Sequence, residues 1–398
     1  MTDIATAEAL ILAHMPKFPA RPEPLAACID RVLAEDVAAE RDQPPFDRVT
    51  MDGIAITYHD WATGVRSFEV VGTQAAGAEP LTIAGAQCVE VMTGTSLPLR
   101  ADTVVPVERV QRQDGAARIA ADADVKAGQF VHRRGTDCAA GSRVLQAGTR
   151  LGPPEIAVLA GAGRATALVA ELPRVAVIST GDELVDAGKP IAAHQIRSTN
   201  DRAIEATLTR HRLGSVTRAR LRDDANALAV AIDRLDTELD VLVLSGGVSM
   251  GQFDFVPSVL AELGAKLVFH RVEQRPGRPM WFGVSARNKP IFALPGNPVS
   301  TLVCATRYIL PALRRAAGLA AARVELVELV TPVEASPTLA RFVPVTLSSS
   351  ERGTLLAEPH LTNTSGDFAT LAGTDGFVEL AAKDGVYAPG TVARLFRW

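Results

Sequence analysis

The sequence has little of several features that would define its class at once. Its 398 residues include only four cysteines and 5% aromatic residues, and no apolar run reaches about 18 residues, so no membrane span is expected. The cysteines lie far apart and form no C-x-x-C pair, which fits a reducing cytoplasm better than a zinc site. The net charge of −4 argues against a general nucleic-acid binder.

Other missing patterns argue against secretion, metal binding by histidine and nucleophilic catalysis. The first residues, Met1 to Glu8, contain no basic stretch followed by an apolar one, so no secretion signal is expected. The seven histidines show no metal-ligand spacing, and no Ser-His-Asp grouping is visible. No cysteine lies in a loop motif with a nearby histidine. We therefore predict neither zinc chemistry nor a covalent intermediate.

The chain divides into four stretches of different pattern. Short helices are predicted at Ala7–Met15, with Thr6 as cap, and at Leu25–Val37. Short alternating runs separated by turns predict a β-rich segment at 42–148, and Pro153 begins a helix that ends near Gly161 or Gly163. Strand-like alternation returns at 321–398 and predicts a small β domain.

Residues 173–320 alternate apolar strands with helical stretches, including a helix from Asp201 to Arg212 with Gly214 as its cap. This pattern predicts a doubly wound, mostly parallel sheet, and hence a multidomain α/β protein. The strands are expected at Val175–Ile178, Val241–Leu244, Lys266–Phe269 and Ile291–Leu294.

The stretch from Asp240 to Asp254 is the most informative part of the sequence. A buried strand is followed by a small-residue loop, and a helical pattern begins at Asp254. Glycines let backbone N–H groups approach a ligand, and a helix N-terminus carries partial positive charge. This loop is therefore a candidate anion cradle, with Ser245, Gly246, Gly247, Ser249 and Gly251 as its candidate binding residues.

Two other predicted strands lead into similar loops, Ser179–Glu183 and Pro295–Pro298, the second containing Gly296 and Asn297. The carboxyl ends of parallel strands meet at one edge of a sheet, where ligands commonly bind. A tight turn could explain one such loop, but three at three strand ends predict a binding crevice.

The charged residues near this edge allow two interpretations each. Asp182, Glu183, Asp254 and the pair Asp223-Asp224 could be helix caps, or they could hold Mg²⁺ with water and substrate phosphate. Arg275 and Arg278 flank a Pro-Gly turn, which could be a solvated loop. Alternatively, both arginines could face an oxyanion, since guanidinium groups make bidentate contacts to such ions.

Several motifs together resemble one family. Val49–Ala55 resembles an S-x-M-D-G-Y-A signature, Met92–Val105 an M-T-G-x-x-x-P…A-D-x-V-V element, and His132–Asp137 an R-x-x-G-x-D loop. The three strand-end loops, Ser365-Gly366 and Thr374–Gly376 match in order and spacing. The chain thus resembles the molybdopterin molybdotransferases, the family that includes the gephyrin E-domain.

The resemblance implies a fold, an activity and partners. It implies a split N-terminal domain at 1–41 and 149–172, a β-rich domain inserted at 42–148, an α/β domain at 173–320 and a β domain at 321–398. The implied reaction inserts molybdate into adenylylated molybdopterin and releases AMP with a divalent metal such as Mg²⁺. The implied form is a cytoplasmic homodimer whose cleft faces the partner's β-rich domain, with the preceding adenylyltransferase and apo-molybdoenzymes as further partners.

By motif, the family's functional positions fall on seven residues of this sequence: Asp52, Thr93, Asp137, Glu183, Asp224, Asp254 and Ser365. Glu183, Asp254 and Asp224 would be the metal ligands, and Asp52, Thr93 and Asp137 would line the cleft of the other subunit. The sequence departs from the signatures at Val49, Ile54 and His132, and it has Arg275 and Arg278 in place of the usual lysines.

Two other functions are considered beside the enzyme. A carrier or insertion chaperone would bind molybdopterin without turnover, and a scaffold would use linkers to bind other proteins. The acids expected in the cleft favour the enzyme over the carrier. No partner-binding linker is visible in the sequence, which disfavours the scaffold.

Overall fold

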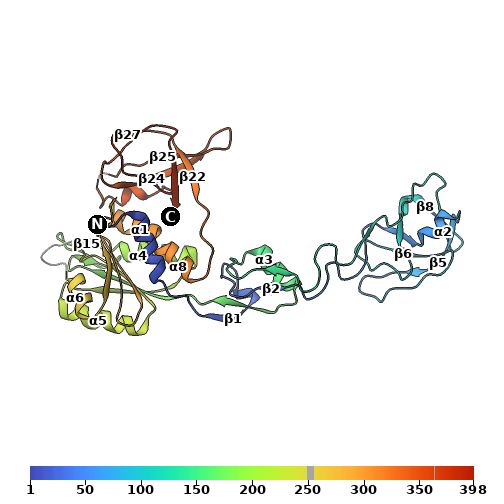
Figure 1. The fold of residues 1–398 in the computed structure, drawn as a ribbon, viewed down its shortest axis with the longest axis horizontal. Coiled ribbons are helices and arrows are strands. Elements are labelled where there is room, and N and C mark those ends of the chain that lie inside the picture. Colours follow the sequence, from blue (N-terminus) through green and yellow to red (C-terminus); the bar gives the residue numbers. More distant parts are fainter. Residues whose placement is uncertain (249–254, 363) are drawn as a thin grey trace. The chain divides into compact units, whose positions relative to one another are not determined.

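The computed structural model describes residues 1–248, 255–362 and 364–398, which form two compact units (Figure 1). Unit 1 contains residues 1–35, 147–152 and 166–398, and unit 2 contains residues 36–146 and 153–165. Both units combine sheets with short helices, as the predicted multidomain α/β class requires. The predicted division into four domains is finer than these two units and stays a prediction.

A six-stranded sheet forms the centre of unit 1. Its strand order is β16-β13-β17-β21-β20-β18, in which the first four strands are parallel and β20 runs antiparallel to both of its neighbours, β21 and β18. The mostly parallel sheet is therefore confirmed, and each predicted strand is present. The bounds are β13 (Arg174–Thr180), β16 (Ser215–Leu221), β17 (Val241–Ser245), β18 (Lys266–His270), β20 (Trp281–Val284) and β21 (Pro290–Leu294).

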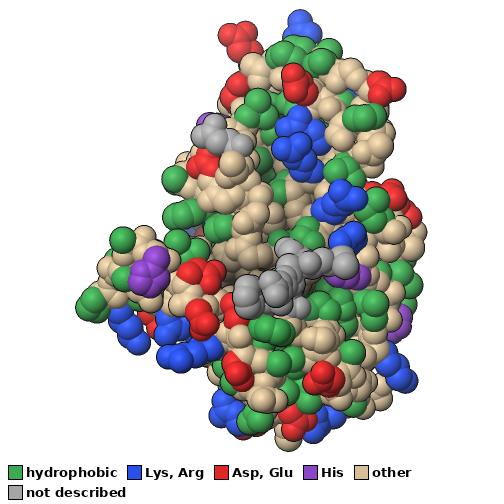
Figure 2. All heavy atoms as spheres, turned by 90° about the vertical axis from the view of Figure 1, so that its left-hand side faces the viewer, with side chains coloured by type: hydrophobic (Ala, Val, Ile, Leu, Met, Phe, Trp, Pro, Cys, Tyr) green, Lys and Arg blue, Asp and Glu red, His purple; other side chains and the backbone are tan. Residues whose placement is uncertain are grey.

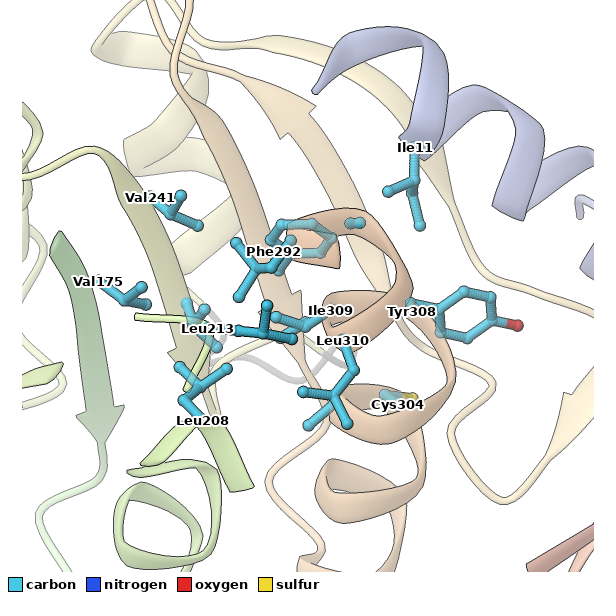
Figure 3. Close-up of a cluster of buried hydrophobic side chains, with 14 of the residues drawn as sticks. Ile11, Val175, Leu208, Leu213, Val241, Phe292, Cys304, Tyr308, Ile309 and Leu310 are labelled. Atoms are coloured by element: carbon cyan, nitrogen blue, oxygen red, sulfur yellow. The ribbon is translucent and has the colours of Figure 1, made fainter. Parts of the chain in front are cut away.

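Alternation along the strands builds two hydrophobic layers, because successive side chains of a strand point to opposite faces. Val175 and Val177 pack with Leu208 of α4 (Asn200–His211) and with residues of α8 (Leu310–Ala316). Ala176 and Ile178 pack on the other face, against α5 (Ala225–Glu238) and α6 (Val256–Glu262). Figure 1 shows these helix pairs on the two sides of the sheet, and Figure 3 shows the first layer.

One continuous helical run crosses the first layer. It consists of α7 (Pro298–Cys304), the π-helical turn η3 (Ala305–Ile309) and α8, and most of its residues are buried. The N-terminal helix α1 (Ile4–His14) adds Ala7 and Ile11 to the same core. Its cap is Asp3, which accepts a hydrogen bond from the Thr6 backbone N–H at 2.9 Å, so the prediction of Thr6 as cap was wrong.

The predicted helix at Leu25–Val37 was also wrong. Only the 3-10 turn η1 (Leu25–Ala27) forms there, after β1 (Ala20–Pro24). Val32 and Leu33 make β-bridges to Arg150 and Val169, so tertiary pairing outweighs the helical pattern of these residues. At the end of α4, the left-handed cap is Arg212 (φ 50°) rather than the predicted Gly214.

The C-terminal part of unit 1 is a small closed barrel. Strands pair in the order β24-β25-β22-β28-β26, and β26 returns to β24. The remaining strand of this sheet, β19 (Gln274–Arg275), pairs with β24 and so joins the barrel to the α/β part. The barrel strands are β22 (Glu325–Leu329), β24 (Ala340–Ser349), β25 (Leu355–Pro359), β26 (Gly376–Leu380) and β28 (Val392–Arg397), with η4 (Ala369–Leu371) and the pair β23 (Val333–Glu334) and β27 (Val386–Tyr387).

Short two-stranded sheets complete unit 1. They pair β1 with β12 (Thr166–Ala170) and β14 (Leu184–Val185) with β15 (Ile196–Arg197). No helix in the described ranges of the chain is long and apolar enough to cross a membrane.

Unit 2 is rich in β-structure, as the sequence predicts for this segment. Its main sheet has the order β7-β4-β6-β5-β9-β8, over a core that includes Ile54 and Phe68. The sheet strands are β4 (Gly53–Ile56), β5 (Ser67–Thr73), β6 (Gln87–Val91), β7 (Thr103–Pro106), β8 (Val110–Gln113) and β9 (Ala116–Ile119). The other elements are β2 (Val37–Ala38), β3 (Arg48–Val49), β10 (Val131–His132), β11 (Arg143–Leu145), α2 (Tyr58–Ala62), η2 (Val107–Arg109) and α3 (Pro153–Gly161).

Candidate active site

A cleft of about 1050 Å³ opens in unit 1, where the carboxyl ends of β13, β17 and β21 face residues of the C-terminal barrel. Figure 2 shows one face of the molecule with a hollow in its middle and Lys and Arg side chains along one side of that hollow. Most residues predicted for the α/β and C-terminal parts of the site line this cleft. They are Glu183, Ser245, Gly246, Gly247, Arg275, Arg278, Pro295, Gly296, Asn297 and Ser365.

The three strand-end loops converge as predicted, and Asn200 ties two of them together. Its Nδ2 donates to Ser245 Oγ at 2.8 Å and to the Gly296 carbonyl oxygen at 2.7 Å. Gly246 has φ +101°, and a Cβ there would lie 2.7 Å from the Thr180 carbonyl oxygen, so only glycine lets these loops approach so closely. The predicted binding residues Ser249 and Gly251 lie outside the described residues, as does Asp254.

Two buried hydroxyl groups in the cleft have no hydrogen-bond partner among the residues that the structure describes. Ser179 and Thr180 are 2% and 5% exposed, and their oxygens are unpaired in the structure. A buried hydroxyl without a partner costs free energy, which a ligand oxygen could recover by accepting a hydrogen bond. These groups therefore fit a phosphate or another oxyanion.

The start of α4 was missed as part of the site. Ser198, Thr199 and Asn200 line the cleft at the N-terminus of this 12-residue helix. A helix N-terminus attracts anions through its unpaired N–H groups. The polar run Ser198-Thr199-Asn200 ahead of a predicted helix was the available signal, but it did not follow a predicted strand.

The arginine loop, residues 275–278, places both predicted arginines at the cleft, where both are exposed. A third arginine, which the sequence analysis missed, lies beside Arg275. Arg275 is paired in register with Arg341 across β19 and β24, and Arg341 also lines the cleft. Burial lowers the pKa of Arg341, and the charge of Arg275 lowers it further. An anion bound between them would relieve this repulsion. No sequence motif marks Arg341, which lies within a strand.

The carboxylates are fewer in the described part of the cleft than the arginines. Glu183 and Asp223 line it, together with four arginines: Arg197, Arg275, Arg278 and Arg341. Asp224 caps α5 by accepting the Ala227 N–H at 2.8 Å. Among the residues that the structure describes, no three His, Cys, Asp or Glu side chains gather as metal ligands. The described lining thus fits anions, and the predicted metal ligand Asp254 is not among the residues that the structure describes.

Ser365 belongs to the barrel, but it is held at the N-terminus of α7. Asn297 Nδ2 donates to Ser365 Oγ at 2.6 Å, and the Val299 N–H donates to the Ser365 carbonyl oxygen at 3.1 Å. The two walls of the cleft are therefore hydrogen-bonded to each other at this point.

Asp52, Thr93 and Asp137 belong to unit 2 and are exposed. Asp52 Oδ1 accepts from the Thr93 backbone N–H at 2.7 Å and from Thr93 Oγ1 at 2.9 Å, and these bonds lower the pKa of Asp52. Asp137 Oδ1 lies 2.9 Å from His132 Nε2. Within unit 2, Asp52 and Thr93 therefore act as one fixed polar group.

A mostly parallel α/β sheet with glycine-bearing loops, unpaired hydroxyls and an arginine loop at one edge defines a binding protein for phosphorylated or oxyanionic ligands. Family models identify the family. Residues 2–163 match the MoeA N-terminal region (domain I and II), residues 176–315 a probable molybdopterin binding domain, and residues 327–395 the MoeA C-terminal region (domain IV).

Individual relatives of this chain carry the names of the same family. A molybdopterin molybdenumtransferase of Synechocystis sp. is 36% identical over 400 residues, covering 100% of both chains. One from Bacillus subtilis is 33% identical over 298 residues, covering 72% of this chain and 68% of that protein. A solved MoeA structure from Pyrococcus horikoshii is 30% identical with a TM-score of 0.86, covering 100% of this chain and 99% of that one. The chain belongs to the molybdopterin molybdenumtransferase (MoeA) family, which consists of transferases of molybdenum cofactor biosynthesis.

Proposed function

We propose that this chain transfers molybdate to adenylylated molybdopterin and releases AMP. The single observation that carries the proposal is the convergence, in one cleft, of a glycine loop, two unpaired hydroxyls and the arginine loop. Such a cleft can bind two kinds of anion at once, a phosphorylated substrate and an incoming oxyanion. Membership of a molybdopterin molybdenumtransferase family supports the molybdopterin nucleotide and molybdate as these two anions.

Two groups of the described residues would bind the two anions. Gly246, Gly247 and the Ser245 hydroxyl would hold phosphate oxygens, together with the N-terminus of α4 and the loop Pro295–Asn297. Arg275, Arg278 and Arg341 would attract molybdate and hold it by bidentate contacts. No covalent intermediate is needed, because positioning and charge neutralisation lower the barrier to cleavage of a phosphate anhydride.

We propose Mg²⁺ as the metal, held by Glu183 and Asp254 with Asp224 as a further candidate. When bound, Mg²⁺ would neutralise charge on the phosphate anhydride. Glu183 is exposed at the cleft and available for this role. The Asp224 oxygen that caps α5 is engaged with Ala227, so its role as a ligand would depend on its second oxygen.

We also propose a cytoplasmic homodimer in which Asp52, Thr93 and Asp137 of one subunit complete the cleft of the other. The family resemblance supports this arrangement. The exposure of the Asp52–Thr93 pair makes it available to another chain. The preceding adenylyltransferase and apo-molybdoenzymes are the proposed exchange partners for substrate and product.

The decisive experiment incubates the protein with adenylylated molybdopterin, molybdate and Mg²⁺ and measures AMP. We expect AMP release that depends on both molybdate and the metal. Binding of the nucleotide without AMP release would contradict the proposal and would support the carrier instead. A Glu183→Gln variant that keeps its nucleotide affinity but loses AMP release would separate chemistry from binding.

A further inference from the structure

A chain of buried polar groups connects the arginine loop to the helical run beneath it. Gln274, directly before Arg275, is 0% exposed. Its Oε1 accepts a hydrogen bond from the Tyr308 hydroxyl of η3. Its Nε2 donates to the Pro276 carbonyl oxygen at 3.2 Å and to Cys304 Sγ at 3.4 Å, and the Cys304 thiol donates to the Gly277 carbonyl oxygen at 3.8 Å.

The Pro276 carbonyl oxygen determines how the Gln274 amide faces, because it can only accept and so must meet the NH₂ end. The amide oxygen then faces Tyr308 and accepts from its hydroxyl. Burial raises the pKa of Tyr308, so the hydroxyl stays protonated and can donate. Figure 3 shows Tyr308 and Cys304 on the side of the helical run that is turned away from Leu208.

The loop also packs directly on these groups. Gly277 has φ +94°, and a Cβ there would lie 2.5 Å from Gln274 Nε2 and 2.6 Å from Cys304 Sγ. On its other side, the loop is closed by a hydrogen bond from the Val272 N–H to the Arg278 carbonyl oxygen at 2.9 Å. The loop backbone is therefore held from below and at its base, while its two arginine side chains remain exposed at the cleft.

We propose that Tyr308 and Gln274 are positioning residues that hold the backbone of the arginine loop in the geometry in which Arg275 and Arg278 receive the oxyanion. The proposal rests on the function proposed above. Like charges repel, and the loop brings Arg275 close to Arg341 before any anion arrives. A loop fixed from within the core keeps these charges together, so that the anion does not have to supply the free energy of ordering them.

The test is Tyr308→Phe in the full chain, a change that removes one oxygen and keeps the ring. We expect the molybdate KM to rise about two- to tenfold, the usual effect of losing one hydrogen bond. We expect kcat at saturating molybdate and the KM for adenylylated molybdopterin to stay at wild-type values. Gln274→Leu removes both ends of the link and should raise the molybdate KM further, with thermal unfolding confirming that the variant folds.

The chain offers a matched control. Tyr387 also donates its hydroxyl to a carbonyl oxygen, that of Ala381, in the C-terminal part of the chain and outside the lining of the cleft. Tyr387→Phe should leave the molybdate KM unchanged. A wild-type molybdate KM in Tyr308→Phe would overturn the proposal. So would a fall in kcat and a rise in the KM for the nucleotide that are as large as the rise in the molybdate KM.

A second readout separates the two proposals. Equilibrium binding of molybdate to the protein, measured by calorimetry, does not depend on turnover. A wild-type protein that binds molybdate without releasing AMP would contradict the proposed function alone. In that case, weaker molybdate binding by Tyr308→Phe than by Tyr387→Phe would still support the positioning role, and equal binding would overturn it.

Discussion

Arg278 shows what a single side chain contributes to the proposed anion site. It is exposed, lines the cleft and has no carboxylate partner among the described residues, whereas many other arginines are paired. Its Nε contacts Met1 Sδ at 3.2 Å, a weak acceptor that an oxyanion would replace. Its charge is therefore available to a ligand.

We predict that Arg278→Ala lowers the affinity for molybdate by roughly ten- to a hundredfold, since a charge-assisted contact contributes about 1.5–3 kcal/mol. Arg278→Lys should lose less if charge is what matters, and nearly as much if the planar guanidinium is required. The measurement is AMP release as a function of molybdate concentration, and the defect should shrink at saturation. Arg352→Ala, an exposed arginine in a turn outside the cleft, is the control. Unchanged molybdate dependence in Arg278→Ala would make the loop a solvated turn.

Among the individual residues of the cleft, the sequence predicted those that lie in motifs and missed those that do not. Arg275, Arg278 and the glycine loop were recognisable because small or charged residues follow buried strands. Arg341 and Ser198 reach the cleft through strand pairing and a helix start that are far from the motifs in sequence. Single-sequence patterns carry no information on such long-range register.

An ion pair between Arg174 and Asp240 lies where β13 and β17 begin side by side. Arg174 donates to Asp240 from its backbone N–H at 2.8 Å and from its guanidinium at 3.1 and 2.8 Å. Burial raises the pKa of Asp240, but the bonds from Arg174 outweigh it and hold that pKa below its usual 3.8. The pair joins β13 to β17 directly before their register begins at Val175 and Val241.

We predict that Asp240→Asn destabilises the protein by roughly 1 kcal/mol near neutral pH, after allowance for solvent screening. Because the pKa of Asp240 is lower in the folded state, its contribution is complete above the unfolded value and is lost as the pH falls through the folded value. The difference between variant and wild type should therefore vanish at low pH. Thermal unfolding at pH 7 and below about pH 3 measures this. A difference that persists in acid would mean that packing, not charge, is responsible.

Among the elements, strands were predicted best and the N-terminal segment worst. Runs such as Val241–Leu244 are apolar at every position, which is typical of strands buried on both faces. Residues 28–37 show a helical spacing of apolar residues, yet their backbone bonds go to Leu151, Thr149 and Leu168. Those partners lie more than a hundred positions away, so local propensity could not reveal them.

Arg307 links three parts of unit 1. It lies in η3, is 1% exposed, and pairs with Glu8 of α1 at 2.9 Å and Glu379 of the barrel at 2.7 Å. Its guanidinium also lies over the Phe396 ring, 4.9 Å from the centroid. The N-terminal helix, the α/β part and the barrel therefore share one buried cation.

We predict that Arg307→Met destabilises the whole of unit 1 by about 3–5 kcal/mol, because it leaves two carboxylates without their cation. The control is Arg397→Met, since Arg397 makes an ion pair with Glu325 in which both side chains are nearly half exposed, at 46% and 47%. That variant should lose less than about 1 kcal/mol. Chemical denaturation measures both, and equal losses would contradict the proposed role of Arg307.

The proposed shared site leads to a prediction for the assembled molecule. Asp52→Ala and Glu183→Ala are each expected to abolish AMP release in a homodimer. A heterodimer of the two should regain one intact site, because one subunit supplies a normal Asp52 and the other a normal Glu183. The measurement is AMP release after unfolding and refolding the two variants together. A mixture no more active than its parents would contradict a site shared between subunits.

The long interruption between β1 and its partner has a consequence for the time course of synthesis. Ala20 of β1 pairs with Ala170 of β12, and α1 packs into a core that extends to Leu319. These pairings of β1 and α1 therefore cannot form until β12 and the later core residues have been made. At roughly 5–20 residues per second, β1 waits about 8–30 seconds on the ribosome for β12. Unit 2 can close its own sheet during that interval. Residues 1–35, although made before unit 2, are therefore among the last parts of unit 1 to find their partners.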